Sequence, residues 1–296
     1  MYYSSNTKVF LNGHFIEAKD AQTGTFSQSL HYGNGVFEGI RSYKTDAGVK
    51  IFKAKEHYER LLYSAEKMHI KIDYEVDDLI KKTYDLLKTN NLTNAYIRPL
   101  VYAGPNMALL PPEETNLFIC AWKWDRYLGE GGLNVVTSPF ERPNPKSCFV
   151  EAKVTGHYTN SILASTDAKA KGFDEALLLD HHGFVAEAPG ANFFFEKNGN
   201  IFTPKAGNIL PGITRSTIIE LAKDLGYKVK EGLYTLKDVY GADSAFFAGT
   251  AVEVASIKAL DNIKFTKNWK DTIGYELSLI YNQLVLDQYQ QPLTVI

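Results

Sequence analysis

A glycine-rich stretch near the middle of the chain is the feature that most restricts its fold. Residues 126–132 read Arg-Tyr-Leu-Gly-Glu-Gly-Gly, with three glycines in seven positions. Glycines at this density interrupt helices and strands, so the stretch is typical of a linker. The chain has 296 residues, which is long for one hydrophobic core and suits two domains. We therefore predict a small N-terminal domain over residues 1–125, a linker over 126–134 and a larger domain over 135–296.

Helices and strands are grouped within each half rather than alternating regularly along the chain. In the first half we expect a hairpin over 8–17 that turns at Asn12-Gly13, helices over 55–70 and 76–90, and strands over 94–102 and 116–123. In the second half we expect helices over 158–171, 214–225 and 268–289, with a meander of strands at 175–179, 184–188, 192–196 and 201–203. This grouping favours an α+β fold over a doubly wound parallel sheet.

Composition excludes several classes of function. The net charge is −2 and no run of Lys or Arg occurs, so no nucleic-acid partner is expected. No apolar run approaches 18 residues, so no membrane span is expected. The seven histidines form no HxxxH or HExxH pair, so no metal site is predicted. Cys120 and Cys148 form no CxxC pair, and a disulfide framework is not expected. We therefore predict a soluble protein of the cytoplasm.

Five segments carry residues that are suited to chemistry at a cofactor. Lys153 lies between a predicted strand end and a helix start, and a lysine with a fixed position and a depressed pKa can form a Schiff base. The sequence Leu-Pro-Gly-Ile-Thr-Arg at 210–215 precedes a predicted helix, whose first N–H groups favour a phosphate. Small residues at 248–251 would let the backbone approach a ligand closely.

The other two segments are a carboxylate in an apolar strand and a loop rich in aromatic residues and glycine. Glu187 is costly to bury there unless it meets a cation or a donor, such as a protonated pyridine nitrogen. Residues 31–41 suit the wall of an apolar pocket. Taken singly, all five segments are also compatible with structural roles: a surface lysine, a capped helix, an ordinary turn, a structural hydrogen bond and a core loop.

The order and spacing of these segments resemble one known family. The stretch His31–Arg41 matches the pattern HYGxxVFEGIR, and Tyr96–Pro99 matches YIRP. Leu210–Arg215 matches LPGITR, and Gly249–Glu253 matches GTAxE. The chain thus resembles the class IV (fold-type IV) pyridoxal 5′-phosphate aminotransferases, and within them the branched-chain amino acid aminotransferases. Glu187-Ala188-Pro189-Gly190-Ala191-Asn192 departs at Pro189 and Ala191 from the family pattern EGxGEN, and residues 107–112 depart from the usual GVNPP form.

The resemblance implies a fold, a cofactor and its ligands. The fold would be a two-domain α+β enzyme, similar to D-amino acid aminotransferase, with a small N-terminal α/β domain and a larger C-terminal β-barrel-like domain with helices. Lys153 would be the catalytic residue and would carry pyridoxal 5′-phosphate as a Schiff base. Glu187 would pair with the pyridine nitrogen and Tyr158 with the 3′ oxygen. The phosphate would be bound by Arg60, Leu210, Ile213, Thr214 and Thr250.

The resemblance also implies the substrates and the assembly. L-leucine, L-isoleucine or L-valine would give up its amino group, which 2-oxoglutarate would then accept to become L-glutamate. The wall of the pocket would comprise Tyr32, Phe37, Gly39 and Tyr127. Arg98 would receive the glutamate γ-carboxylate, and Tyr96, Thr250 and Ala251 the α-carboxylate. Tyr32 and Leu109 would come from the partner subunit, so a homodimer or a higher homo-oligomer is expected.

Two alternatives share part of this pattern. Another class IV enzyme, namely a D-amino acid aminotransferase, an R-selective amine transaminase or an aminodeoxychorismate lyase, would keep the lysine, the glutamate and the phosphate turn. The complete VFEGIR and YIRP segments favour the branched-chain group. A regulatory dimer that binds the cofactor without turnover would be expected to lack Lys153 or Glu187, and both are present.

Overall fold

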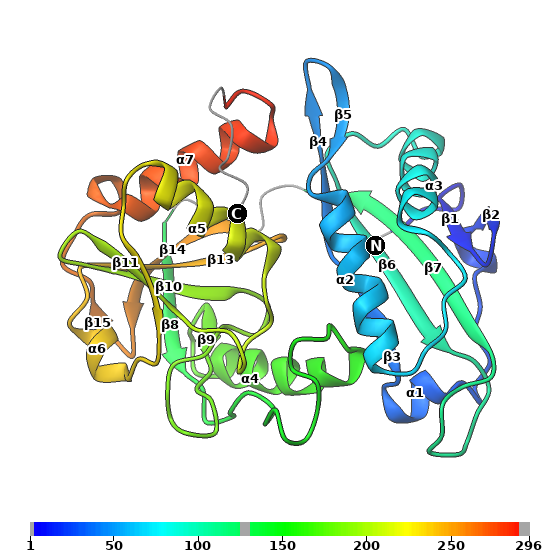
Figure 1. The fold of residues 1–296 in the computed structure, drawn as a ribbon, viewed down its shortest axis with the longest axis horizontal. Helices are drawn as coiled ribbons and strands as arrows, with labels where there is room; N and C mark the ends of the chain where they lie inside the picture. The colour runs from blue at the N-terminus through cyan, green and yellow to red at the C-terminus, as the bar shows by residue number, and fades with distance from the viewer. Residues whose placement is uncertain (1–2, 125–130, 290–296) are drawn as a thin grey trace. The chain divides into compact units, whose positions relative to one another are not determined.

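The computed structural model describes residues 3–124 and 131–289. By packing, the chain divides into two compact units (Figure 1). The first unit comprises Met1–Asp125 and the short segment Ala152–His157, and the second comprises Arg126–Glu151 and Tyr158–Ile296. The lysine at position 153 therefore packs with the first unit, although the chain on both sides of its segment belongs to the second.

An antiparallel sheet forms the first unit. Its strands among the described residues are β1 (Lys8–Leu11), β2 (His14–Glu17), β3 (Gly35–Phe37), β4 (Ile40–Thr45), β5 (Gly48–Ile51), β6 (Ala95–Ala103) and β7 (Thr115–Lys123). They run in the order β2-β1-β7-β6-β4-β5, and β3 pairs with β6. β1 and β2 pair antiparallel, which confirms the predicted hairpin. Its turn residues Asn12 and Gly13 have positive φ values of 47° and 94°, as a tight two-residue hairpin turn requires.

Two helices cover this sheet, and a short one precedes β3. The short helix is α1 (Gln28–Tyr32), and the two that cover the sheet are α2 (Ala54–Lys67) and α3 (Val76–Thr89) (Figure 1). The predicted helices over 55–70 and 76–90 are therefore confirmed. Tyr58, Leu61 and Ala65 recur at helical spacing on α2 and are fully buried. They pack in one apolar cluster with Leu79 and Leu86 of α3 and with residues of the sheet. Burial of this apolar stripe holds α2 and α3 on the sheet.

A mixed sheet forms the second unit. Its strands among the described residues are β8 (Leu133–Thr137), β9 (Glu175–Leu177), β10 (Asn192–Lys197), β11 (Asn200–Pro204), β12 (Val229–Gly232), β13 (Ser244–Gly249), β14 (Glu253–Leu260) and β15 (Ile263–Lys264). The order is β12-β11-β10-β13-β14-β8-β9, with β15 on β14. β8 runs parallel to β14 and β9, and β12 runs parallel to β11, while the other pairs are antiparallel.

The central strands of this sheet are apolar on both faces. Phe194 stacks on Phe246 with ring centroids 5.0 Å apart, and Phe193 meets Phe247 edge-on at 5.9 Å. The helices of the unit are α4 (Tyr158–Ala170), α5 (Ile213–Asp224), α6 (Leu236–Tyr240) and α7 (Ile273–Val285). α5 and α7 pack against β13, and α4 packs against β9 (Figure 1). Residues 192–196 of β10 and 244–248 of β13 are all buried, so both faces of these strands are covered, which explains the apolar runs at 193–195 and 245–248.

Two predicted elements differ from the structure. Residues 184–188 do not form a continuous strand: Val185 bridges Leu179 and Glu187 bridges Asn192 only at isolated positions. The helix predicted over 268–289 is interrupted, because the Thr272 hydroxyl accepts the N–H of Tyr275 and so begins α7 after a short 3-10 turn at Trp269–Asp271. Within residues 3–124 and 131–289, no helix is both long and apolar enough to cross a membrane.

Candidate active site

Lys153 is fixed in the first unit by its own backbone. Its N–H donates to the Oγ of Ser64 on α2 at 3.0 Å, and its carbonyl accepts the N–H of Phe37 on β3 at 3.1 Å. The neighbours Ala152 and Val154 are buried in the apolar cluster of that unit. The Lys153 ammonium lies 4.8 Å from the centroid of the Phe37 ring. A lysine held this way has the defined position that a covalent cofactor link requires.

A buried carboxylate holds the guanidinium of Arg60. The Nε and Nη2 of Arg60 donate to the two oxygens of Glu38 at 2.6 and 2.9 Å, and the Nδ1 of His57 lies 2.8 Å from Glu38 Oε2. Glu38 and His57 are both buried. Because a carboxylate only accepts, Nδ1 carries the proton in this contact. The phosphate ligand predicted at Arg60 is thus oriented by Glu38 and His57, neither of which was predicted as a site residue.

The pKa values of this pair follow from burial and charge. Burial by itself would raise the pKa of Glu38, but the charge of Arg60 and the hydrogen bond from His57 outweigh it and hold that pKa well below its usual range. Burial also lowers the pKa of His57, an effect that the hydrogen bond to Glu38 only partly offsets. At neutral pH the cluster therefore contains an ionised carboxylate, a neutral imidazole and one guanidinium.

Four of the predicted substrate residues come together in the first unit. The Cζ of Arg98 lies 4.6 Å from the centroid of the Phe37 ring and 5.4 Å from that of Tyr96. The Nη2 of Arg98 donates to the Tyr96 hydroxyl at 3.3 Å. Gly39 lies beside that hydroxyl, and a side chain there would overlap it. A cation framed by aromatic rings and a hydroxyl can take up a carboxylate, while the rings offer an apolar wall.

Two tryptophans that were not predicted as site residues pack against Tyr96. The ring centroids of Trp122 and Trp124 lie 5.2 and 5.3 Å from that of Tyr96. The alternation of Trp122 and Trp124 at the end of an apolar strand beside a predicted linker was the signal in the sequence. The two indoles support Tyr96 from the side of β7.

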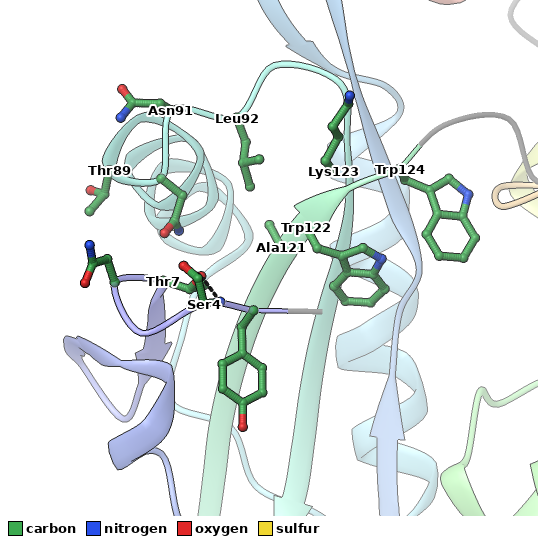
Figure 2. Close-up of a pocket in the computed structure, with 12 residues that line it drawn as sticks. Ser4, Thr7, Thr89, Asn91, Leu92, Ala121, Trp122, Lys123 and Trp124 are labelled. Carbon is green, nitrogen blue, oxygen red and sulfur yellow. Dashed lines mark hydrogen bonds between the residues drawn. The ribbon is translucent and has the colours of Figure 1, made fainter. Parts of the chain in front are cut away.

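A cavity of about 950 Å³ lies where these tryptophans meet the end of α3. Figure 2 shows Trp122 and Trp124 on one side of it, with Thr89 and Asn91 across from them. Its lining comes from residues 3–4, 6–7, 89–92 and 121–124 and includes none of the predicted site residues. We therefore do not assign this cavity to the active site.

Tyr32 and Leu109 lie at the surface of the first unit. Tyr32 ends α1, and its hydroxyl donates to the carbonyl of Met107 at 3.2 Å. The exposed fractions of the Tyr32 and Leu109 side chains are 47% and 82%. The Nε2 of Gln28 donates to the carbonyls of Ala108 and Leu110 and so fixes the loop that carries Leu109. Tyr127, predicted to line the substrate pocket, lies outside the described residues.

Glu187 is the centre of the site residues in the second unit. It is buried, and its Oε2 accepts from the Nδ2 of Asn192 at 2.9 Å. Its Oε1 accepts the N–H of Leu210 at 3.1 Å and lies 2.8 Å from the Nε of Arg142. These partners hold the buried carboxylate in one orientation. Asn192 and Arg142 were not predicted as site residues.

The departures at Pro189 and Ala191 fall in a tight turn that keeps Glu187 in register. The N–H of Ala188 donates to the carbonyl of Ala191 at 2.8 Å, which closes the turn. The carbonyl of Pro189 accepts the Oγ of Ser161 at 2.8 Å, and Ser161 belongs to α4. Tyr158 is the first residue of that helix. The turn therefore anchors the helix that begins with the predicted partner of the cofactor oxygen.

The start of α5 has the features of an anion site. Gly212 is its N-cap residue and offers no side-chain hydrogen bond to the first turn, which begins at Ile213 and Thr214. The first N–H groups of a helix without a capping side chain, together with the helix dipole, favour a phosphate. Arg215 points elsewhere: its Nη2 donates to the carbonyl of Pro204 at 2.8 Å and to Glu231 at 2.6 Å. It ties α5 to β11 and β12.

Thr250 and Ala251 lie in the turn between β13 and β14, which Gly249 and Glu253 close as a strand pair. Glu253 has a φ of 56°, the left-handed conformation that ends such a turn. A Cβ on Gly249 would lie 3.2 Å from both the Cβ of Ala191 and the carbonyl oxygen of Gly190. The Thr250 turn therefore packs closely on the Glu187 turn, and both belong to the same part of the second unit.

Comparisons with known proteins identify the family to which the chain is similar. The family model of class IV amino-transferases matches residues 35–260. The branched-chain-amino-acid aminotransferase of Pseudomonas aeruginosa is 40% identical over 283 residues, which cover 94% of this chain and 92% of that protein. The enzyme of the same name from Escherichia coli K12 is 38% identical over 264 residues, 86% of this chain and 85% of its own.

Solved structures show the same similarity in three dimensions. The branched-chain aminotransferase of Thermoproteus uzoniensis with norvaline has a TM-score of 0.92 and 35% identity, and covers 95% of both chains. The branched-chain amino acid aminotransferase of Thermobaculum terrenum in its PLP-form, the holo-form, has a TM-score of 0.90 and 32% identity, and covers 96% of both chains.

The chain belongs to the class IV aminotransferases, and it has their two-domain α+β fold, fold-type IV. Within that class it is a member of the branched-chain-amino-acid aminotransferase family, which is a family of enzymes.

Proposed function

We propose that the chain transfers the amino group of L-leucine, L-isoleucine or L-valine to 2-oxoglutarate, with pyridoxal 5′-phosphate as the cofactor on Lys153. The observation that carries this proposal is the buried carboxylate of Glu187, which lies beside the uncapped start of α5. A fixed anion next to a helix N-terminus suits a ligand that has a protonated ring nitrogen at one end and a phosphate at the other.

The residues that the family resemblance assigns to this cofactor occur in both units. In the second unit Glu187 would hold the ring nitrogen, Tyr158 the 3′ oxygen, and the N–H groups of Ile213 and Thr214 the phosphate. Leu210, whose N–H orients Glu187, and Thr250, in the adjoining turn, complete that half. In the first unit Arg60 would bind the phosphate and Lys153 would form the covalent link. Pyridoxal 5′-phosphate, when bound, takes up the electrons that are left on the substrate Cα when its C–H bond breaks.

The protein residues would then move one proton and hold two carboxylates. The amine of Lys153, once released by the incoming substrate, would take the proton from the substrate Cα and return it at the cofactor carbon. Tyr96 and the N–H groups of Thr250 and Ala251 would bind the α-carboxylate. Phe37 and Gly39, together with Tyr32 and Tyr127, would enclose the branched side chain, and Arg98 would bind the γ-carboxylate of glutamate. The contacts among Phe37, Tyr96 and Arg98 support this assignment.

We also propose a homodimer as the smallest active form. The first unit exposes large apolar side chains just before α1, on α1 and in the loop after β6, namely Phe26, Leu30, Tyr32, Met107, Leu109 and Leu110. An apolar patch of this kind marks an interaction surface. Tyr32 and Leu109, expected to reach a partner's pocket, are members of it. We place the enzyme in the cytoplasm, because Cys120 and Cys148 are free thiols, which suit a reducing compartment.

A half-reaction tests the chemistry directly. The purified holoenzyme is mixed with L-leucine without any oxo acid, and the absorbance of the bound cofactor is followed. We expect the band of the aldehyde form to be replaced by that of the amine form, and 2-oxoglutarate to restore it. The Lys153→Ala variant is the control and should show no conversion. Conversion by D-alanine or a chiral amine but not by L-leucine would overturn the proposed substrate class, and no conversion by any amine would overturn the proposed reaction.

A further inference from the structure

We propose that Arg142 is a positioning residue that keeps the carboxylate of Glu187 ionised and ready for the ring nitrogen of the cofactor. This inference rests on the function proposed for Glu187. The Nε of Arg142 lies 2.8 Å from Glu187 Oε1, and the two side chains are 8% and 6% exposed. Arg142 belongs to the stretch that links β8 to the Lys153 segment, a region that matches none of the motifs noted in the sequence.

The partners of Glu187 described above have different tasks. Asn192 and the backbone N–H of Leu210 are neutral donors, one on each carboxylate oxygen. They fix the direction of the carboxylate, but neither brings a charge. Arg142 is a cation that the fold places against it. A carboxylate buried without a counter-charge takes up a proton, and a protonated carboxyl cannot form an ion pair with a protonated ring.

The Nε of Arg142 meets Glu187 as a charge rather than as an aligned hydrogen-bond donor. Its Nε is buried and has no aligned acceptor among the described residues, although Glu187 Oε1 is only 2.8 Å away. The two atoms therefore form a close ion pair, and the N–H bond of the Arg142 Nε does not point at Glu187 Oε1. Glu187 can then exchange part of this pairing for the ring nitrogen without losing a formed hydrogen bond to the Nε of Arg142.

Hydrogen bonds fix the backbone that carries Arg142. The N–H of Arg142 donates to the carbonyl of Leu179 at 2.8 Å, and the carbonyl of Glu141 accepts the Nδ2 of Asn160 on α4 at 2.7 Å. Leu179 bridges Val185, two residues before Glu187. The same local backbone thus carries both members of the ion pair, so Arg142 is in place before any cofactor binds.

Substitution of Arg142 tests this role by cofactor affinity, which is a readout other than turnover. In the apoenzyme, the Arg142→Met variant should bind pyridoxal 5′-phosphate roughly 10- to 100-fold more weakly, the range for a lost contact to a charged group. Arg142→Lys keeps the charge and should recover most of that loss. Both variants should bind an analogue with carbon in place of the ring nitrogen as the unsubstituted protein does. Lys267→Met is the matched control, because Lys267 pairs with the buried Glu196 of the same unit.

A double variant separates this inference from the proposed function. In Glu187→Gln, Arg142 is left as a buried cation without its carboxylate, so adding Arg142→Met should cost no further affinity and should raise the melting temperature of the apoenzyme. The inference is overturned if Arg142→Met binds the cofactor normally, or if it weakens binding equally in the Glu187→Gln background. If instead Glu187→Gln alone leaves affinity and turnover unchanged, the role of Glu187 itself, and with it the proposed site, is wrong.

Discussion

The hydroxyl of Tyr96 occupies the space that a side chain at Gly39 would need: a Cβ on Gly39 would lie 1.9 Å from it. Gly39 ends the segment that carries Phe37 and Glu38, and Tyr96 also meets Arg98. The two residues therefore determine together how much of the apolar wall is open. Glycine is required here for the closeness of the approach, since its φ lies outside the left-handed range.

We expect Gly39→Ala to reduce kcat/KM for L-leucine by about 10-fold or more, because the ring of Tyr96 must shift from the proposed substrate site. Steady-state kinetics with L-leucine and with L-glutamate measure the effect. Gly24→Ala is the matched control, because a Cβ there meets no atom within 4 Å. Equal kinetics for the two variants would contradict the assignment of Tyr96.

Protonation of His57 should destabilise the first unit in mild acid. The folded-state pKa of His57 is lowered, so the unfolded chain, with an ordinary pKa of about 6.5, binds the proton first. The contribution of neutral His57 to the free energy of unfolding is therefore fully present above about pH 6.5 and is lost as the pH falls below that value. The lowered pKa of Glu38 acts in the same direction below about pH 4.3, the ordinary value for glutamate.

The melting temperature of the apoenzyme, measured between about pH 7.5 and pH 5, checks this expectation. His57→Gln should show a smaller decrease over that range than the unsubstituted protein, because its side chain cannot take up the proton. His14→Gln, at an exposed position on β2, should follow the unsubstituted protein. A decrease that is the same in all three proteins would mean that His57 does not control acid stability.

Gly212→Ala should detach Asn192 from Glu187. A Cβ on Gly212 would lie 1.9 Å from the Oδ1 of Asn192, whose Nδ2 donates to Glu187 and to the carbonyl of Leu210. Loss of such contacts should weaken binding of pyridoxal 5′-phosphate by roughly 10-fold, as expected for hydrogen bonds to a charged group. Equilibrium titration of the apoenzyme measures this, with Gly190→Ala as the control in open space. If both variants bind the cofactor alike, Asn192 has no part in orienting Glu187.

Leu109→Asp should dissociate the proposed dimer. A charge placed in the exposed apolar cluster of the first unit opposes burial against a second copy. We expect the molar mass in solution, measured by light scattering, to fall to that of one chain, with a loss of activity in parallel. Leu233→Asp, at an exposed site in the second unit, should leave both unchanged. A monomeric variant with full activity would refute the contribution of a partner subunit to the site.

Local signals in the sequence predicted much of the fold. Asn12-Gly13 allows few conformations, and the apolar spacing of Tyr58, Leu61 and Ala65 is satisfied by a helix on a sheet, so both predictions are confirmed. Residues 184–188 look like a strand but bond to several partners: Val185 donates to Tyr234, and Ala186 donates to Leu178. Such a pattern is set by tertiary contacts that alternation of residues does not reveal.

The candidate site shows the same division between local and distant information. Lys153, Glu187 and the 210–215 turn can be predicted from the sequence because they stand in recognisable motifs. Arg142 stands in no such motif, and its contact with Glu187 joins residues distant in sequence, which no spacing rule specifies. Asn192 and His57 lie nearer to their partners, but their contacts with the buried carboxylates of Glu187 and Glu38 depend on the tertiary fold. The domain limits 1–125 and 135–296 stay a prediction, because most of the proposed linker lies outside the described residues.

The packing of Ala152–His157 into the first unit has a consequence for biosynthesis. Val154 bridges Val36, and Lys153 is bonded to Ser64, so these contacts join residues nearly ninety or more positions apart. A nascent chain leaves the ribosome from its N-terminus, and the first unit cannot acquire its lysine until residue 157 has emerged. The ribosome must therefore translate β8, a strand of the second unit, before it has made every residue of the first unit. A fragment that stops at residue 125 would lack both the lysine and the segment that covers its core.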